Sequence, residues 1–216
     1  MGSQQSSSED AQPTFSAGNI DVALMGLSDT GKSHFLGTIG GPEYAQHRPT
    51  NGTETVPLRY KGRLIRLTEF GGCRSESWAH LMQVTRYSCI IWFIDSHDSL
   101  EDILTARNRI HDACMRPQLM LPKMPALCIV HNMGRPHSIR RNVEAAMHTM
   151  EWAEHRTTRD AGGAVLWGDL PAVVDLGYLE KVHGPVYLTQ LSYGDLEVPV
   201  FLLNWVLETC RNGARS

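Results

Sequence analysis

Apolar and polar positions follow one another along the chain in a pattern that predicts strands and helices in turn. An apolar run at 20–25 ends at Gly26, and the segment after it becomes helical near Ser33. Runs at 53–60 and 63–69 indicate two more strands, and the two residues between them include the glycine that a tight hairpin needs. The chain therefore begins with a strand, a loop and a helix, followed by a hairpin.

The rest of the chain continues this alternation. Apolar runs without alternation at 88–95 and 126–130 are typical of strands that helices cover on both faces. Residues 155–184 read as an irregular insertion, and 95–98 are expected to end a strand and to cap the next helix. The fold class predicted is α/β, with a mostly parallel six-stranded sheet and helices on both faces. The other predicted elements are a strand at 186–189 and helices at 100–110, 139–152 and 200–209.

Length and composition favour one domain in a reducing compartment. Residues 1–18 are rich in Ser and Gln and lack an apolar period, so we expect a disordered tail before a domain at 19–212. The 20 Lys and Arg and 23 Asp and Glu give a net charge of -3, which argues against a nucleic-acid partner. The 5 cysteines form no C-x-x-C pair and predict neither a disulfide framework nor a zinc site. No apolar run reaches the roughly 20 residues of a membrane span.

The loop after the first strand carries the clearest chemical signal. Residues 26–33, Gly-Leu-Ser-Asp-Thr-Gly-Lys-Ser, match G-x-x-x-x-G-K-[ST] at every defined position. Backbone N–H groups of such a loop and the positive end of the next helix converge on phosphate. Lys32 is predicted to neutralise the outer phosphates, and the Ser33 hydroxyl to bind a magnesium ion that bridges phosphate oxygens.

From Lys32 onward the sequence resembles an Arf-type small GTPase, a member of the P-loop NTPase fold. Pro49-Thr50-x-Gly52, Tyr60-Lys61, Gly71-Gly72 and 95–98 stand at that family's intervals. The resemblance implies that Thr50 completes the magnesium shell, that Glu69 supports the ion through water, and that Gly72 donates its N–H to the terminal phosphate. The nucleotide-binding residues implied are Gly26, Leu27, Ser28, Asp29, Thr30, Gly31, Lys32, Ser33, His34, Gly72, Asn132, Arg135 and Leu191.

Two departures from the family pattern concern hydrolysis. Cys73 stands where the family has the switch II Gln that orients the attacking water. A thiol cannot donate and accept hydrogen bonds as an amide does, so weak or absent intrinsic GTP hydrolysis is predicted. Glu69 replaces the usual Asp, which keeps the charge and lengthens the arm. Catalytic roles are therefore assigned to the position of Cys73 and to Thr50 only.

Base recognition departs further from the family. Its N-K-x-D stands here as Asn132-Met133-Gly134-Arg135, and an Arg offers only donors where guanine needs an acceptor. Gln190-Leu191-Ser192 replaces the family's S-A-K loop. Three interpretations follow: GTP bound through altered contacts, a relaxed or different base preference, or no nucleotide binding.

The expected partners are GTP or GDP, with Mg²⁺ as cofactor, and effector and regulatory proteins that contact the switch regions. The family's aromatic triad for effectors falls on Thr53, Thr68 and Gln83, so the partners of typical Arf proteins are not assumed. Residues 1–6 fit the pattern for myristoylation of Gly2, which would add a weak membrane contact. A cytoplasmic location is expected, with peripheral contact to Golgi or ciliary-base membranes.

The function expected is a nucleotide-dependent switch in intracellular protein transport, vesicular or ciliary. One alternative is a pseudo-GTPase scaffold with relaxed or no nucleotide specificity. A second is a P-loop phosphotransferase, against which Gly71-Gly72 at the switch II interval counts.

Overall fold

The computed structural model describes residues 19–41, 50–72, 78, 87–95, 98–115, 126–132, 170–183, 185–191 and 197–213. The predicted tail at 1–18, the predicted helix at 139–152 and the first part of the predicted insertion lie outside these residues, as do Cys73, Gln83 and Arg135.

Six strands form one sheet in the order β2-β3-β1-β4-β5-β6. All neighbouring pairs are parallel except β2 and β3, which form the predicted antiparallel hairpin. This confirms the six-stranded, mostly parallel sheet that the alternation predicted. The strands are β1 (Asn19–Met25), β2 (Thr53–Tyr60), β3 (Arg63–Phe70), β4 (Cys89–Asp95), β5 (Ala126–Asn132) and β6 (Val186–Leu191).

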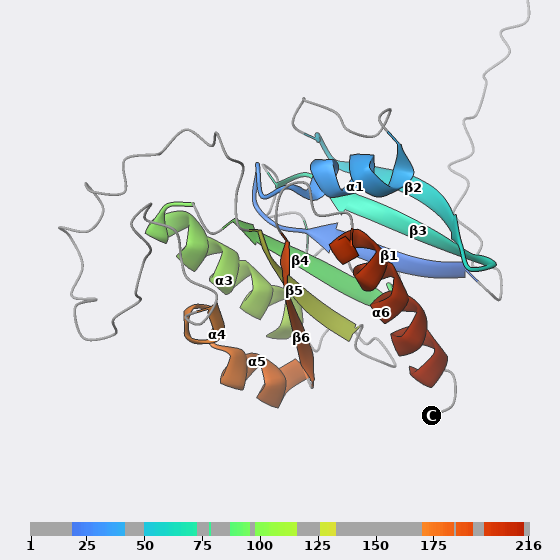
Figure 1. Cartoon of the computed structure of the whole chain (residues 1–216). Helices are drawn as coiled ribbons and strands as arrows, with labels where there is room; N and C mark the ends of the chain where they lie inside the picture. Colours follow the sequence, from blue (N-terminus) through green and yellow to red (C-terminus); the bar gives the residue numbers. More distant parts are fainter. Residues whose placement is uncertain are drawn as a thin grey trace, which may run out of the picture.

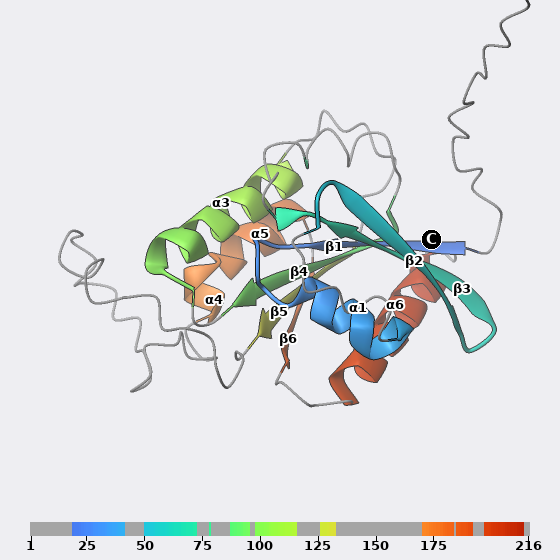
Figure 2. The same cartoon turned by 90° about the horizontal axis from the view of Figure 1, so that it is seen from above.

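Helices lie on both faces of the sheet (Figures 1 and 2). On one face are α1 and α6, and on the other are α3, α4 and α5. Their bounds are α1 (Lys32–Gly40), α3 (Leu100–Met115), α4 (Leu170–Val173), α5 (Leu176–His183) and α6 (Glu197–Gly213). None of the described helices is long and apolar enough to cross a bilayer.

The period of two along β1 divides the core into two layers. Val22 and Leu24 belong to the layer that includes Phe35 of α1 and Leu202 of α6. Ala23 and Met25 point to the opposite face and belong to the layer that includes residues of α4 and α5. Because both faces are covered, residues 20–25 of β1 are apolar except for Asp21, which is paired with Arg66.

The hairpin turn and one helix cap show how local sequence sets local structure. Lys61 and Gly62 both have positive φ, 47° and 75°, as a two-residue hairpin turn demands. The cap of α3 is Ser99 rather than the predicted 95–98 segment. The Ser99 Oγ accepts from the Asp102 N–H over 3.1 Å and donates to the Asp102 carboxylate over 2.6 Å. A hydroxyl directly before the helix is better placed to cap it than a carboxylate further back.

The interpretation of 155–184 as irregular is wrong for its described part. Residues 170–183 form α4 and α5, and Leu170, Val174 and Leu179 are fully buried in the core layer on this face of the sheet. These apolar residues recur at helical spacing, but a short four-residue helix and a break at Asp175 (φ 53°) interrupt the period. The glycines and the proline nearby therefore led to the prediction of an irregular segment, whereas the chain forms two short packed helices.

Candidate phosphate-binding site

The loop between β1 and α1 has the backbone of an anion cradle. Gly26, Asp29 and Gly31 have positive φ values of 142°, 62° and 95°. Gly31 precedes α1 directly, and no side chain caps that end of the helix. The N-terminal end of α1 therefore follows the loop directly, in the arrangement that binds phosphate at helix N-termini.

Packing against β4 explains why the loop must begin with glycine. A Cβ at Gly26 would lie 2.5 Å from the Phe93 carbonyl oxygen and 2.8 Å from the Thr30 Oγ1. Thr30 is buried, and its hydroxyl donates to the Leu27 carbonyl over 3.0 Å. Close packing of Gly26 against β4 and the hydrogen bond of Thr30 thus hold the loop in this conformation.

The ammonium group of Lys32 lies over this loop. It donates to the carbonyl oxygens of Gly26 over 2.8 Å and of Leu27 over 2.6 Å, and the residue is only 4% exposed. A buried cation needs such acceptors, and a polyphosphate would add negative charge beside it. Lys32 therefore holds a fixed positive charge against the phosphate loop.

Ser33 and Glu69 form the part of the site that suits a metal ion. The Ser33 Oγ donates to Glu69 Oε1 over 2.8 Å, although the two residues are 36 positions apart. Glu69 is 3% exposed, and its Oε2 is buried without a hydrogen-bond partner among the described residues. A hydroxyl and a buried carboxylate with an unused oxygen are hard oxygen donors, which Mg²⁺ prefers. Ser33 and Glu69 thus fit a magnesium ion, which would screen the phosphate charge.

The ends of β2 and β3 close against the loop. The Gly71 N–H donates to the Gly52 carbonyl over 2.8 Å, and a Cβ at Gly71 would collide with the Thr50 carbonyl oxygen. A Cβ at Gly72 would collide with the backbone of Leu27 and Ser28. Of the two predicted switch residues, Gly72 therefore lies against the phosphate loop, and Thr50 lies against the preceding residue, Gly71.

Trp78 was not identified from the sequence, yet it supports this corner. Its Nε1 donates to the Gly71 carbonyl over 3.1 Å, and its ring meets that of Trp92 edge to face at 5.2 Å. It is 3% exposed. An isolated tryptophan outside every predicted element gives no sequence signal for this role.

The remaining predicted contacts are placed in part. Asn132 and Leu191 are register partners at the carboxyl ends of β5 and β6, so the backbone brings them to one edge of the sheet. His34 lies in the first turn of α1, beside Ser33. Cys73 and Arg135 lie outside the described residues, and their roles stay predictions.

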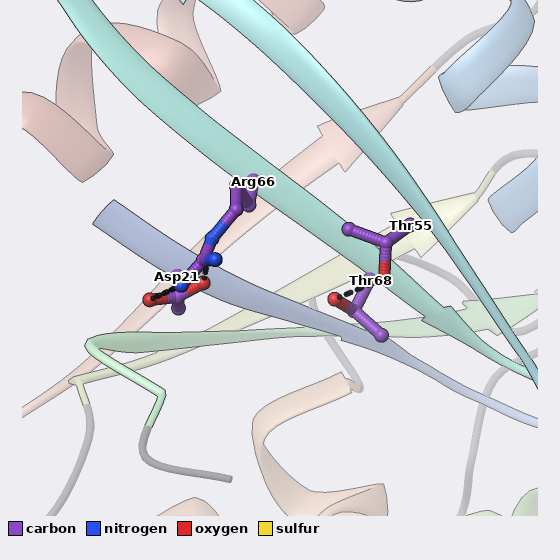
Figure 3. A network of polar contacts seen from close by, with 4 residues as sticks. All are labelled: Asp21, Thr55, Arg66 and Thr68. Atoms are coloured by element: carbon purple, nitrogen blue, oxygen red, sulfur yellow. Dashed lines mark hydrogen bonds and ion pairs between the residues drawn. The ribbon is translucent and has the colours of Figure 1, made fainter. Parts of the chain in front are cut away.

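The sheet beside the site carries a polar network on β1, β2 and β3, drawn in Figure 3. Arg66 donates to both carboxylate oxygens of Asp21, over 2.6 and 2.8 Å. These hydrogen bonds raise the pKa of Arg66 above its ordinary value, against the opposing effect of burial. The hydroxyls of Thr55 and Thr68 lie 3.0 Å apart, and Thr68 is buried. Of the three triad positions, Thr68 is therefore already engaged within the chain, while Thr53 is exposed.

Comparisons with known proteins agree with this geometry. A family model described as the ADP-ribosylation factor family matches residues 11–143. ADP-ribosylation factor-like protein 15 of Bos taurus is 25% identical over 118 residues, which are 54% of this chain and 56% of that protein. ADP-ribosylation factor-like protein 8d of Arabidopsis thaliana is 25% identical over 115 residues, 50% of this chain and 62% of that protein. The alignments thus span little more than half the length of these relatives.

A solved structure supports the fold. The Arl6 BBS3 small GTPase from Trypanosoma brucei, with a bound nucleotide analogue GppNp, superimposes with a TM-score of 0.63 at 17% identity. The match covers 90% of this chain and 98% of that one. Since the family model matches more than half of its residues, this chain belongs to the ADP-ribosylation factor family.

Proposed function

We propose that this chain is a switch that binds GTP and GDP with Mg²⁺ and changes its partner surface with the third phosphate. The observation that carries the proposal is the packing of Gly72 on the phosphate loop at Leu27 and Ser28. A terminal phosphate that took the Gly72 N–H would have to change this contact, whereas a diphosphate need not. Such a difference between two ligands is what a switch requires.

Lys32, Ser33 and Glu69 supply the binding chemistry in this proposal. Lys32 adds a fixed positive charge to the N–H groups of the loop. Ser33 and Glu69 would hold the magnesium ion, which supplies charge neutralisation for the phosphates, and Thr50 would join them from the start of β2. With Cys73 in place of the amide, hydrolysis is slow, so the signal would end through a partner protein or through nucleotide exchange.

A finer assignment rests on a short resemblance. Residues 48–53 and 69–73, Arg-Pro-Thr-Asn-Gly-Thr and Glu-Phe-Gly-Gly-Cys, are similar to Arf-like protein 16, which also carries Glu and Cys at these places. This resemblance supports a setting in membrane traffic that serves the cilium, with a cytoplasmic chain that reaches the membrane through myristoylated Gly2. Intact mass of the protein from eukaryotic cells tests the lipid, because an unmodified Gly2 would exclude it.

The rival function is a scaffold that holds one nucleotide permanently or none, and Arg135 at the base-reading position favours it. Affinities for GTP, GDP and ATP, each with Mg²⁺ and with EDTA, separate the two. The switch requires magnesium-dependent guanine binding and different conformations with GTP and with GDP, which amide hydrogen exchange around Gly72 compares. The same conformation with both nucleotides, or no binding, would leave the scaffold.

Lys32→Ala supplies the site-specific test. It should weaken binding of either guanine nucleotide about 10-fold to 100-fold, because a charge-assisted hydrogen bond contributes about 1.5–3 kcal/mol. Lys181→Ala removes an exposed charge on α5 and should leave the affinity unchanged. Equal effects of the two substitutions would contradict binding at this loop.

A further inference from the structure

Two acidic side chains lie directly opposite one another on the hairpin that closes the site. In the antiparallel register of β2 and β3, Glu54 pairs with Glu69. Directly opposite residues share a face of the sheet, with Cβ atoms about 4.5–5.5 Å apart. The next pair on that face, Val56 and Leu67, belongs to the core layer beneath α1. Glu54 and Glu69 therefore both project toward the side where α1 begins.

The carboxylate of Glu69 is costly to bury without a cation. Glu69 is 3% exposed and keeps one oxygen, Oε2, buried without a hydrogen-bond partner in the described part of the chain, while Glu54 is half-buried. A buried carboxylate oxygen that nothing satisfies indicates a ligand. The Ser33 hydroxyl on the other oxygen shows where that ligand would lie, at the start of α1.

We propose that Glu54 is a further acidic residue of the magnesium site, paired with Glu69 across the hairpin. The proposal rests on the proposed function, since the ion is the one that accompanies the nucleotide. Mg²⁺ gives up its water reluctantly, so Glu54 acts as a positioning residue that accepts hydrogen bonds from the ion's water ligands. β2 follows Thr50 closely in the chain, so Glu54 also links the ion to the segment around Thr50.

The experiment uses the full chain loaded with GDP and the probe Mn²⁺, whose free concentration is read by electron paramagnetic resonance. Glu54→Gln should weaken Mn²⁺ binding about 10-fold or more, as loss of a group outside the first coordination shell does. Glu54→Asp keeps the charge and should recover most of the Mn²⁺ affinity. Glu101→Gln, exposed at the start of α3, is the control and should leave the Mn²⁺ affinity unchanged.

The outcomes separate this inference from the proposed function. Unchanged Mn²⁺ affinity in Glu54→Gln would overturn the inference, because Glu54 would then play no part in holding the ion. Equal loss of affinity in Glu54→Gln and Glu54→Asp would also overturn it, since charge would not matter. Failure of the unmodified chain to bind GDP at all would instead overturn the proposed function and, with it, the metal site.

Discussion

Gly72 lies against the backbone of Ser28, so close that a Cβ at Gly72 would come within 3.0 Å of the Ser28 nitrogen. One residue earlier, Gly71 lies equally close to the Thr50 carbonyl. Two consecutive glycines thus let the end of β3 lie between the phosphate loop and the strand that follows Thr50. Because no side chain separates these three segments, a movement of one must displace the other two.

The first prediction concerns this contact. Gly72→Ala should lower the free energy of unfolding by about 1–3 kcal/mol, because an added methyl group collides with backbone that cannot rotate away. Gly177→Ala is the matched control in α5, where nothing lies within 4 Å of the new Cβ. It should be neutral or stabilising by about 0.5–1 kcal/mol, because alanine favours a helix over glycine. Urea unfolding of both variants measures the difference, and similar midpoints would contradict the packing.

The second prediction concerns the hydrogen bond between Ser33 and Glu69. Ser33→Ala should lower stability in EDTA by about 1–3 kcal/mol, because Glu69 then keeps neither oxygen satisfied within the described part of the chain. Thr38→Ala in the same helix is the control. The Thr38 hydroxyl donates back to the His34 carbonyl over 3.0 Å, and alanine improves helix propensity, so little change is expected. An equal loss in both variants, measured by urea unfolding, would refute the role of Ser33.

The strands and the phosphate loop could be predicted from the sequence because their signals are local. β1 is covered on both faces and its run at 20–25 is apolar except for Asp21, and Gly26 to Ser33 carry a complete motif. The register of the hairpin could be predicted nearly to the residue, since Lys61 and Gly62 define the turn. At these places the local sequence favours the same element that the fold requires, so the sequence alone is enough to predict it.

The rest depends on contacts that sequence spacing does not contain. The bond from Ser33 to Glu69 joins residues 36 positions apart, and Trp78 is aimed at Gly71 by packing against Trp92. The opposition of Glu54 and Glu69 follows from the hairpin register, but only the structure shows that Glu69 is buried with one oxygen unpartnered among the described residues. The helices at 170–183 escaped prediction because their apolar period is broken at Asp175.

The third prediction concerns the ion pair between Asp21 and Arg66. The pair is bidentate, and the side chains are only 9% and 20% exposed, so solvent screens it weakly. A double-mutant cycle with Asp21→Asn and Arg66→Met should give a coupling energy of about 1–3 kcal/mol. Arg63→Met, exposed in the same strand, should change stability by no more than about 0.5 kcal/mol. A coupling energy near zero in urea unfolding would show that the ion pair drawn in Figure 3 does not stabilise the fold.

The last prediction follows from the buried thiol of Cys128 in β5. Burial raises the pKa of Cys128 above its ordinary value, because the thiolate would lose its water. In the unfolded chain the thiol ionises near pH ~8.5, whereas the folded chain keeps the proton. The unfolded state therefore binds fewer protons above that pH, and stability falls as pH rises. Below about pH 8 both states are protonated, and this group adds no pH dependence.

The size of the effect sets the measurement. Each pH unit above the unfolded pKa costs about 1.4 kcal/mol for one thiol, so unfolding free energies at about pH 7.5 and 9.5 should differ by about 1.4 kcal/mol through Cys128. Cys128→Ala removes this group and should flatten the pH dependence by that amount, whatever it does to stability at the lower pH. Cys89 stays in both proteins, and its pKa is raised first by a hydrogen bond with Cys210, then by burial and by the charge of Cys210, and least by Cys128, so most of its contribution cancels in the comparison. Identical slopes of unfolding free energy against pH in the two proteins would contradict the prediction. They would mean that the Cys128 thiol is reached by water and is not shielded in the sheet.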